Sequence, residues 1–126
     1  MSARTVSLLL ALPDDSLLAQ FRDSLSREGY RVETARTAIE CVVKAQRIRP
    51  DFLILDQDIA LGGIDGVLTI LHDHEDMHAP PVILITLERP IDLPTDCLIP
   101  PVVRWVQKPF ALPVLQEAIG ALECLL

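Results

Sequence analysis

Short hydrophobic runs alternate along the chain with longer stretches in which hydrophobic residues recur at helical spacing. The runs predict strands, and the periodic stretches predict amphipathic helices. The strands are expected at residues 6–12, 31–34, 52–55, 82–86 and 102–106. The helices are expected at residues 16–28, between Thr37 and Pro50, after Asp65, and from Ala111 onward.

Single residues mark several of these boundaries. Gly29 is placed to end the first helix, because glycine tolerates the backbone conformation that closes a helix. Thr37 and Asp65 are good N-terminal caps for the second and third helices. The stretch between Asp56 and Asp65 contains two glycines and is expected to be a loop.

The alternation of strands and helices predicts the fold class. It requires parallel strands that are joined by right-handed crossovers, with helices on both faces of the sheet. The segments FLIL and VILI are apolar throughout, as strands buried on both faces should be. We therefore expect an α/β fold with a doubly wound, five-stranded parallel sheet.

The connection between residues 86 and 102 departs from this pattern. It contains four prolines, namely Pro90, Pro94, Pro100 and Pro101. A proline inside a helix costs about 3 kcal/mol, so a full fourth helix is not expected there. The segment is either an irregular loop or a remodelled binding surface.

Length, charge and cysteine content narrow the class of protein. The 126 residues suit one domain, residues 1–126. A net charge of −7 disfavours binding to nucleic acid or to an anionic membrane surface. No apolar run reaches the roughly 18–20 residues needed to span a bilayer, and we expect a cytoplasmic protein. The three cysteines lack metal-binding spacing, and Cys41 is expected to be a small core residue.

Polar residues follow four of the five predicted strands. Asp14 and Asp15 follow the first strand, Asp56 the third, Thr86 the fourth and Lys108 the fifth. In doubly wound sheets the carboxyl ends of the strands meet in one crevice. Grouped carboxylates attract a hard cation such as Mg²⁺, and one carboxylate can act as a nucleophile toward a phosphoryl donor. A lysine and a hydroxyl would then balance charge on the phosphoryl oxygens.

The runs RPDFLILD, IDG, VILIT and VQKPF resemble, in order and spacing, the receiver domain of two-component response regulators. The resemblance covers essentially the whole chain and implies a flavodoxin-like sheet with strand order 2-1-3-4-5. It implies that Asp56 accepts a phosphoryl group from a histidine kinase with Mg²⁺ present. Thr86 matches the switch hydroxyl, Lys108 the phosphate-binding lysine and Trp105 the movable aromatic residue. Taken alone, Asp56 is also compatible with a turn cap, Thr86 with an ordinary strand residue and Lys108 with an exposed lysine.

The sequence departs from the receiver pattern at the metal site. Receivers place two adjacent acidic residues where this chain has Leu12 and Pro13. Asp14 and Asp15 come later; they either reach the metal from a shifted loop or cap the first helix. Asp58 is a further candidate metal ligand, or a solvated loop residue.

Two further departures lie beside Asp56 and Thr86. The loop after Asp56 is longer than the receiver pattern and lacks its usual proline. Leu87 stands where receivers prefer a small residue, and we expect it to cover part of the site.

Two functions follow, together with one remote alternative. The first is a receiver that is phosphorylated at Asp56 and changes its affinity for a partner. The second is a pseudo-receiver that works as an interaction module without phosphorylation, with Mg²⁺ binding weak or lost. The remote alternative is a small flavodoxin-like cofactor-binding domain. We expect no enzymatic activity. The expected partner is a histidine kinase, a phosphotransfer protein, a separate output protein or a second copy of the chain.

Overall fold

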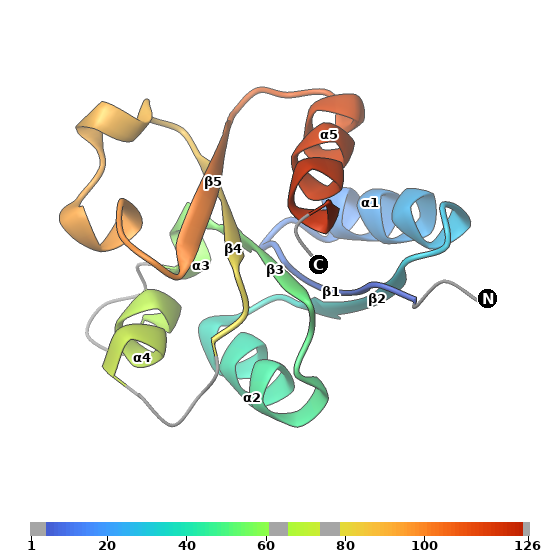
Figure 1. Ribbon diagram of the computed structural model, residues 1–126, viewed down its shortest axis with the longest axis horizontal. Coiled ribbons are helices and arrows are strands. Elements are labelled where there is room, and N and C mark those ends of the chain that lie inside the picture. The colour runs from blue at the N-terminus through green and yellow to red at the C-terminus, as the bar shows by residue number, and fades with distance from the viewer. Residues whose placement is uncertain (1–4, 61–65, 74–78, 125–126) are drawn as a thin grey trace.

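The computed structural model of the protein describes residues 5–60, 66–73 and 79–124. Its centre is a sheet of five parallel strands in the order β2-β1-β3-β4-β5 (Figure 1). The strands are β1 (Ser7–Ala11), β2 (Arg31–Ala35), β3 (Phe52–Asp56), β4 (Val82–Thr86) and β5 (Val102–Gln107). The strand order and the parallel pairing confirm the predicted doubly wound fold.

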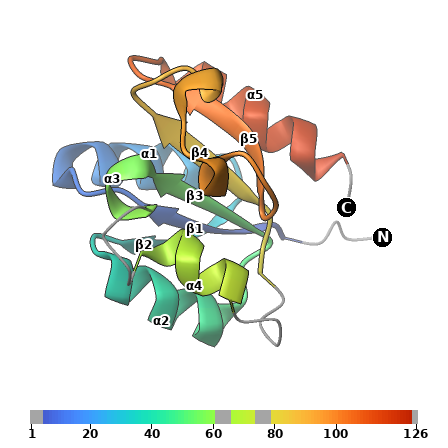
Figure 2. The same ribbon diagram turned by 90° about the vertical axis from the view of Figure 1, so that its left-hand side faces the viewer.

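Helices cover both faces of this sheet, as Figures 1 and 2 show. They are α1 (Asp15–Arg27), α2 (Ala38–Ile48), α3 (Gln57–Ala60), α4 (Val67–Asp73) and α5 (Leu112–Glu123). Successive residues of a strand point to opposite faces, so each strand feeds two core clusters. In β3, Leu53 and Leu55 pack with residues of α2, α3 and α4, whereas Phe52 and Ile54 pack with residues of α1 and α5. Burial on both faces explains why the inner strands are apolar throughout.

The helix boundaries follow the local signals in the sequence. The Thr37 hydroxyl accepts a hydrogen bond of 3.2 Å from the Glu40 amide and caps α2. Gly29 follows the C-terminal end of α1 with a φ of +99°, a conformation that favours glycine. Both predictions are confirmed.

For the connections that follow β3 and β4, one expectation was wrong and one was confirmed. Residues 57–60 form the short helix α3, whereas a loop was expected directly after Asp56. The proposed cap Asp65 lies outside the described residues. The proline-rich connection carries two short 3-10 turns, η2 (Pro90–Asp92) and η3 (Thr95–Cys97), in place of a full helix, as expected.

Cys41 is fully buried in the core, which confirms its prediction as a core residue. This burial, with a smaller effect of Glu40, raises the pKa of its thiol to about 12.

Among the helices of the described segments, none is long and apolar enough to cross a membrane.

Side-chain hydrogen bonds join α5 to the end of α1 and to the start of β2. The Tyr30 hydroxyl donates to Glu123 Oε2 at 2.8 Å, and Gln116 Nε2 donates to Glu28 Oε2 at 2.8 Å. Burial, together with the carboxylates of Glu123 and Glu28, raises the pKa of Tyr30 from 10.0 to about 12. The protonated phenol therefore helps to hold α5 against the start of β2.

We predict that Tyr30→Phe destabilises the protein by about 1 kcal/mol at neutral pH, because it removes a hydrogen bond to a carboxylate. The pKa of Tyr30 is raised in the folded state, so its contribution is present below pH 10 and is lost as the pH rises toward 12. Urea unfolding of both proteins across this range should show the difference in free energy closing. A difference that stays constant with pH would contradict this role.

Candidate functional site

The carboxyl ends of β1, β3, β4 and β5 lie at one edge of the sheet, as parallel pairing requires. Asp56 is the last residue of β3, and Thr86 is the last residue of β4. Lys108 directly follows β5, and its amide donates a hydrogen bond of 2.7 Å to the Thr86 carbonyl. The structure therefore brings together three of the residues that the sequence singled out.

Asp56 and Lys108 form an ion pair at the centre of this edge. The Lys108 Nζ lies 2.6 Å from Asp56 Oδ2, and the Asp58 amide donates to Asp56 Oδ1 at 2.9 Å. Only 3% of the Asp56 side chain is exposed, compared with 30% of the Lys108 side chain. Each carboxylate oxygen thus has a hydrogen-bond donor, which is what a buried carboxylate requires.

Thr86 is buried, and its hydroxyl donates a hydrogen bond of 2.8 Å to the Glu88 carbonyl. Sequence reasoning missed two neighbours, Gln57 and Gln107, which hold the backbone of Leu87. The Leu87 amide donates to Gln57 Oε1 at 3.3 Å, and Gln107 Nε2 donates to the Leu87 carbonyl at 3.2 Å. These contacts fix the turn after β4 from both sides.

Leu87 does not cover Asp56, contrary to our expectation. Its side chain is 61% exposed and does not line the cavity beside Asp56. The two glutamines hold the backbone so that the side chain points to solvent.

The end of β1 carries no acidic side chain toward Asp56. Leu12 is 3% exposed, and Pro13 follows it. Asp14 caps α1, because its Oδ1 accepts hydrogen bonds from the amides of Ser16 and Leu17 at 2.9 and 3.1 Å. Capping was one of the two alternatives that the sequence left open for Asp14.

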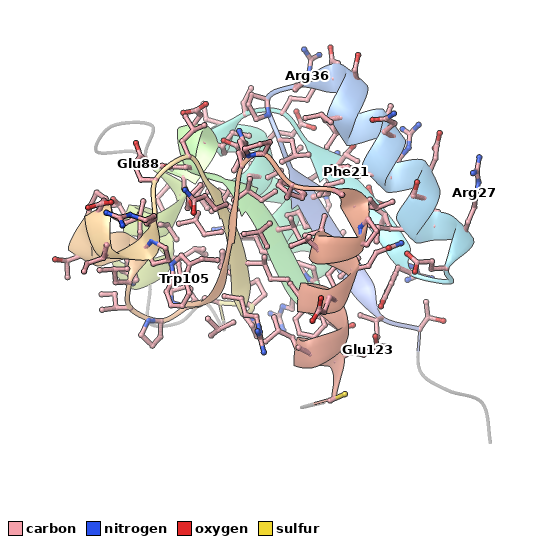
Figure 3. All side chains as sticks on the ribbon, turned by 90° about the horizontal axis from the view of Figure 1, so that it is seen from above. Phe21, Arg27, Arg36, Glu88, Trp105 and Glu123 are labelled. Atoms are coloured by element: carbon pink, nitrogen blue, oxygen red, sulfur yellow. The ribbon has the colours of Figure 1, made fainter. Side chains whose placement is uncertain are left out.

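Asp15 lies in the first turn of α1 and pairs with Arg36 at 2.6 Å. Figure 3 shows Arg36 beside the N-terminal end of α1. Both side chains are more than half exposed, so this pair contributes little to stability. It nevertheless gives the Asp15 carboxylate a cationic partner outside the site.

A small cavity opens beside the ion pair, with a volume of about 120 Å³. Three charged residues, Asp56, Lys108 and Asp14, are among those that line it. Its walls are otherwise apolar and are formed by Leu12, Pro13, Leu17, Phe21, Ile85 and Phe110. The rings of Phe21 and Phe110 lie 5.8 Å apart, and Figure 3 shows Phe21 beside the start of α5.

These donors suit a magnesium ion poorly. Mg²⁺ prefers six oxygen ligands in near-octahedral geometry, and proteins usually bind it through one or two carboxylates together with water. Asp56, the buried carboxylate, is already paired with Lys108 Nζ at 2.6 Å. Within residues 5–60, 66–73 and 79–124, no three or more His, Cys, Asp or Glu side chains are grouped to hold a metal. A metal role for Asp14, Asp15 and Asp58 stays a prediction.

Trp105 lies away from this cavity. Its Nε1 donates a hydrogen bond of 2.7 Å to the Cys97 carbonyl, and its ring packs against the core cluster that includes Leu93. Figure 3 shows it on the side of the molecule away from α1. The hydrogen bond of Trp105 therefore links η3 to β5. Its expected role as a movable aromatic residue stays a prediction.

Comparison with known proteins identifies relatives across most of the chain. The model of the response regulator receiver domain family matches residues 10–120. The Response regulator MprA of Mycobacterium leprae is 30% identical over 115 residues, which cover 90% of this chain and 50% of that protein. The Transcriptional regulatory protein AfsQ1 of Streptomyces coelicolor is 40% identical over 60 residues, which cover 48% of this chain and 26% of that protein. The chain therefore spans at most half the length of these curated relatives.

A structural comparison supports the fold. The chemotaxis response regulator CheY4 of Vibrio cholerae superposes with a TM-score of 0.81, covering 94% of this chain and 98% of that chain. The sequence identity is 21%, so this likeness bears on the fold alone.

The capping role of Asp14 makes a testable prediction. Asp14→Ala should destabilise the protein by about 1 kcal/mol, whereas Asp14→Asn should cost only a few tenths, because asparagine is an equally good N-terminal cap. Urea unfolding with and without Mg²⁺ measures both effects. If Asp14 instead holds a metal, Mg²⁺ will stabilise the wild type and Asp14→Asn will lose that stabilisation.

Proposed function

This chain belongs to the response regulator receiver domain family of two-component signalling, and we propose that it works there as a phosphorylation-independent interaction module. The single observation that carries the proposal is the apolar end of β1, where Leu12 and Pro13 stand in place of the two acidic residues that hold the metal in receivers. Leu12 is 3% exposed and lines the cavity beside Asp56. Of the two Asp56 oxygens, one pairs with Lys108 Nζ and the other accepts from the Asp58 amide.

Phosphorylation of an aspartate makes demands that this site meets poorly. The carboxylate must reach the phosphorus atom, and cationic groups must balance charge on the phosphoryl oxygens. Asp56 as a whole is only 2% exposed, and among the described residues that line the cavity Lys108 is the one cation. Leu12 and Pro13 give the cavity an apolar wall, which disfavours a strongly hydrated ion.

The contacts around the turn after β4 support a domain that stays in one conformation. The Thr86 hydroxyl is engaged by the Glu88 carbonyl, and Gln57 and Gln107 hold the Leu87 backbone. A ligand shifts a conformational equilibrium only if it interacts differently with the two states. Without a phosphoryl group to draw Thr86 inward, the domain presents a constant surface to its partner.

On this proposal residues 1–126 act as one cytoplasmic signalling domain and carry out no reaction of their own. The partner is a histidine kinase, a phosphotransfer protein, a separate output protein or a second copy of the chain. The net charge of −7 makes direct binding to nucleic acid unfavourable.

A phosphorylatable receiver remains the second candidate function, because a specific distance favours it. Lys108 Nζ lies 2.6 Å from Asp56 Oδ2, and both residues stand where the family resemblance puts the phosphate-binding lysine and the phosphoacceptor. In that case the ion pair would open, and Lys108 and Thr86 would contact the phosphoryl oxygens.

A labelling experiment separates the two functions. The wild type and Asp56→Asn are incubated with acetyl phosphate and Mg²⁺, and intact-mass spectrometry counts added phosphate. We expect neither protein to be labelled, while a receiver that keeps both acidic residues is labelled in the same reaction. One phosphate on the wild type and none on Asp56→Asn would replace the proposal with the phosphorylatable receiver.

Fluorescence of Trp105, the only tryptophan, provides a second readout. Titration with Mg²⁺ into the millimolar range should leave its emission unchanged, because the donors beside Asp56 do not fit the ion. A saturable change that Asp56→Asn abolishes would contradict the proposal.

A further inference from the structure

The cavity beside Asp56 is built from elements that are rigidly placed. Its walls come from the end of β1, the first turns of α1, β4 and the segment between β5 and α5. Ile85 is 1% exposed and Leu12 is 3% exposed, so these walls are anchored in the core. A space of about 120 Å³ with such walls is close to the roughly 150 Å³ of an apolar cavity that admits benzene.

A second hollow, with a volume of about 310 Å³, shares Leu17, Phe21 and Phe110 with the cavity. The cavity itself is partly open, and Leu17, which is 38% exposed, stands at its boundary with solvent. A small molecule can therefore reach the cavity from solvent.

The polar floor of the cavity contains the Lys108 ammonium, whose side chain is 30% exposed. Lys108 Nζ has three hydrogens, of which one is directed to Asp56 Oδ2. A hydroxyl group suits this ammonium, because its oxygen can accept a hydrogen bond from Nζ. The two charges balance each other, so an uncharged ligand adds no unpaired charge to an apolar space.

We infer that this cavity binds a small uncharged alcohol or phenol whose apolar body is about the size of a benzene ring. The ring lies among Leu17, Phe21 and Phe110, and the hydroxyl accepts a hydrogen bond from Lys108. The inference rests on the proposed function, because a metal and a phosphoryl group would need the same space.

Phenol is the probe that tests this inference, with toluene as its match in shape. Phenol is added to the ¹⁵N-labelled protein, and amide shifts are followed by NMR. We expect saturable shifts for Leu17, Lys108 and Phe110, and none along α2. Toluene lacks the hydroxyl, so we expect it to bind about tenfold more weakly, the loss expected for one hydrogen-bonding group.

A pair of tryptophan substitutions locates the site. Leu17→Trp places a large ring at the mouth of the cavity, on a partly exposed position that tolerates it. Ile39→Trp is the matched control, because Ile39 is 78% exposed on α2. Phenol shifts should be lost in Leu17→Trp and kept in Ile39→Trp, with both variants giving folded spectra.

Three outcomes would overturn the inference: no saturable shift with phenol, equal binding of phenol and toluene, or unchanged phenol binding in Leu17→Trp. The labelling experiment with acetyl phosphate separates this failure from failure of the proposed function. An unlabelled protein that does not bind phenol contradicts the ligand alone. A protein that is labelled on Asp56 and does not bind phenol contradicts both.

Discussion

A carboxylate that is almost fully removed from water must have partners, and the pairing of Asp56 with Lys108 meets this requirement at the edge of the sheet. The two residues lie at the ends of β3 and β5, on either side of β4. Their ion pair therefore joins the ends of β3 and β5 across the intervening strand β4. In a site with several carboxylates a metal would have to offset their repulsion, whereas here one ammonium group balances one carboxylate.

On the proposed function no metal is held at this edge, which accounts for the neighbouring departures from the receiver pattern. The end of β1 then carries Leu12 and Pro13, whose side chains extend the apolar wall around the Phe21 ring. Asp14 is then available to cap α1. Leu12 and Pro13 thus suit a site in which the charges of Asp56 and Lys108 already neutralise each other.

Much of the fold could be predicted from the sequence, because it depends on local or repeated signals. Apolar strands, the Thr37 cap and the prolines after β4 each act through the backbone or through burial. The proximity of Asp56 and Lys108 also followed from the topology, since both stand at strand ends. The contacts of Gln57 and Gln107 could not be foreseen, because they depend on side-chain torsions and on the exact spacing of β3, β4 and β5. Two expectations were wrong, namely that Leu87 would cover part of the site and that a loop would directly follow Asp56. The contacts of Gln57 and Gln107 accompany both differences.

The stability of this edge of the sheet depends most directly on the energetic coupling between Asp56 and Lys108. A double-mutant cycle measures it from urea unfolding of four proteins: the wild type, Asp56→Asn, Lys108→Met and the double variant. We predict a coupling of roughly 0.5–3 kcal/mol, the range for residues in contact. Lys108→Met should be the more destabilising single change, because it leaves a buried carboxylate without its cation. Additive effects, with a coupling near zero, would contradict the central role of this ion pair.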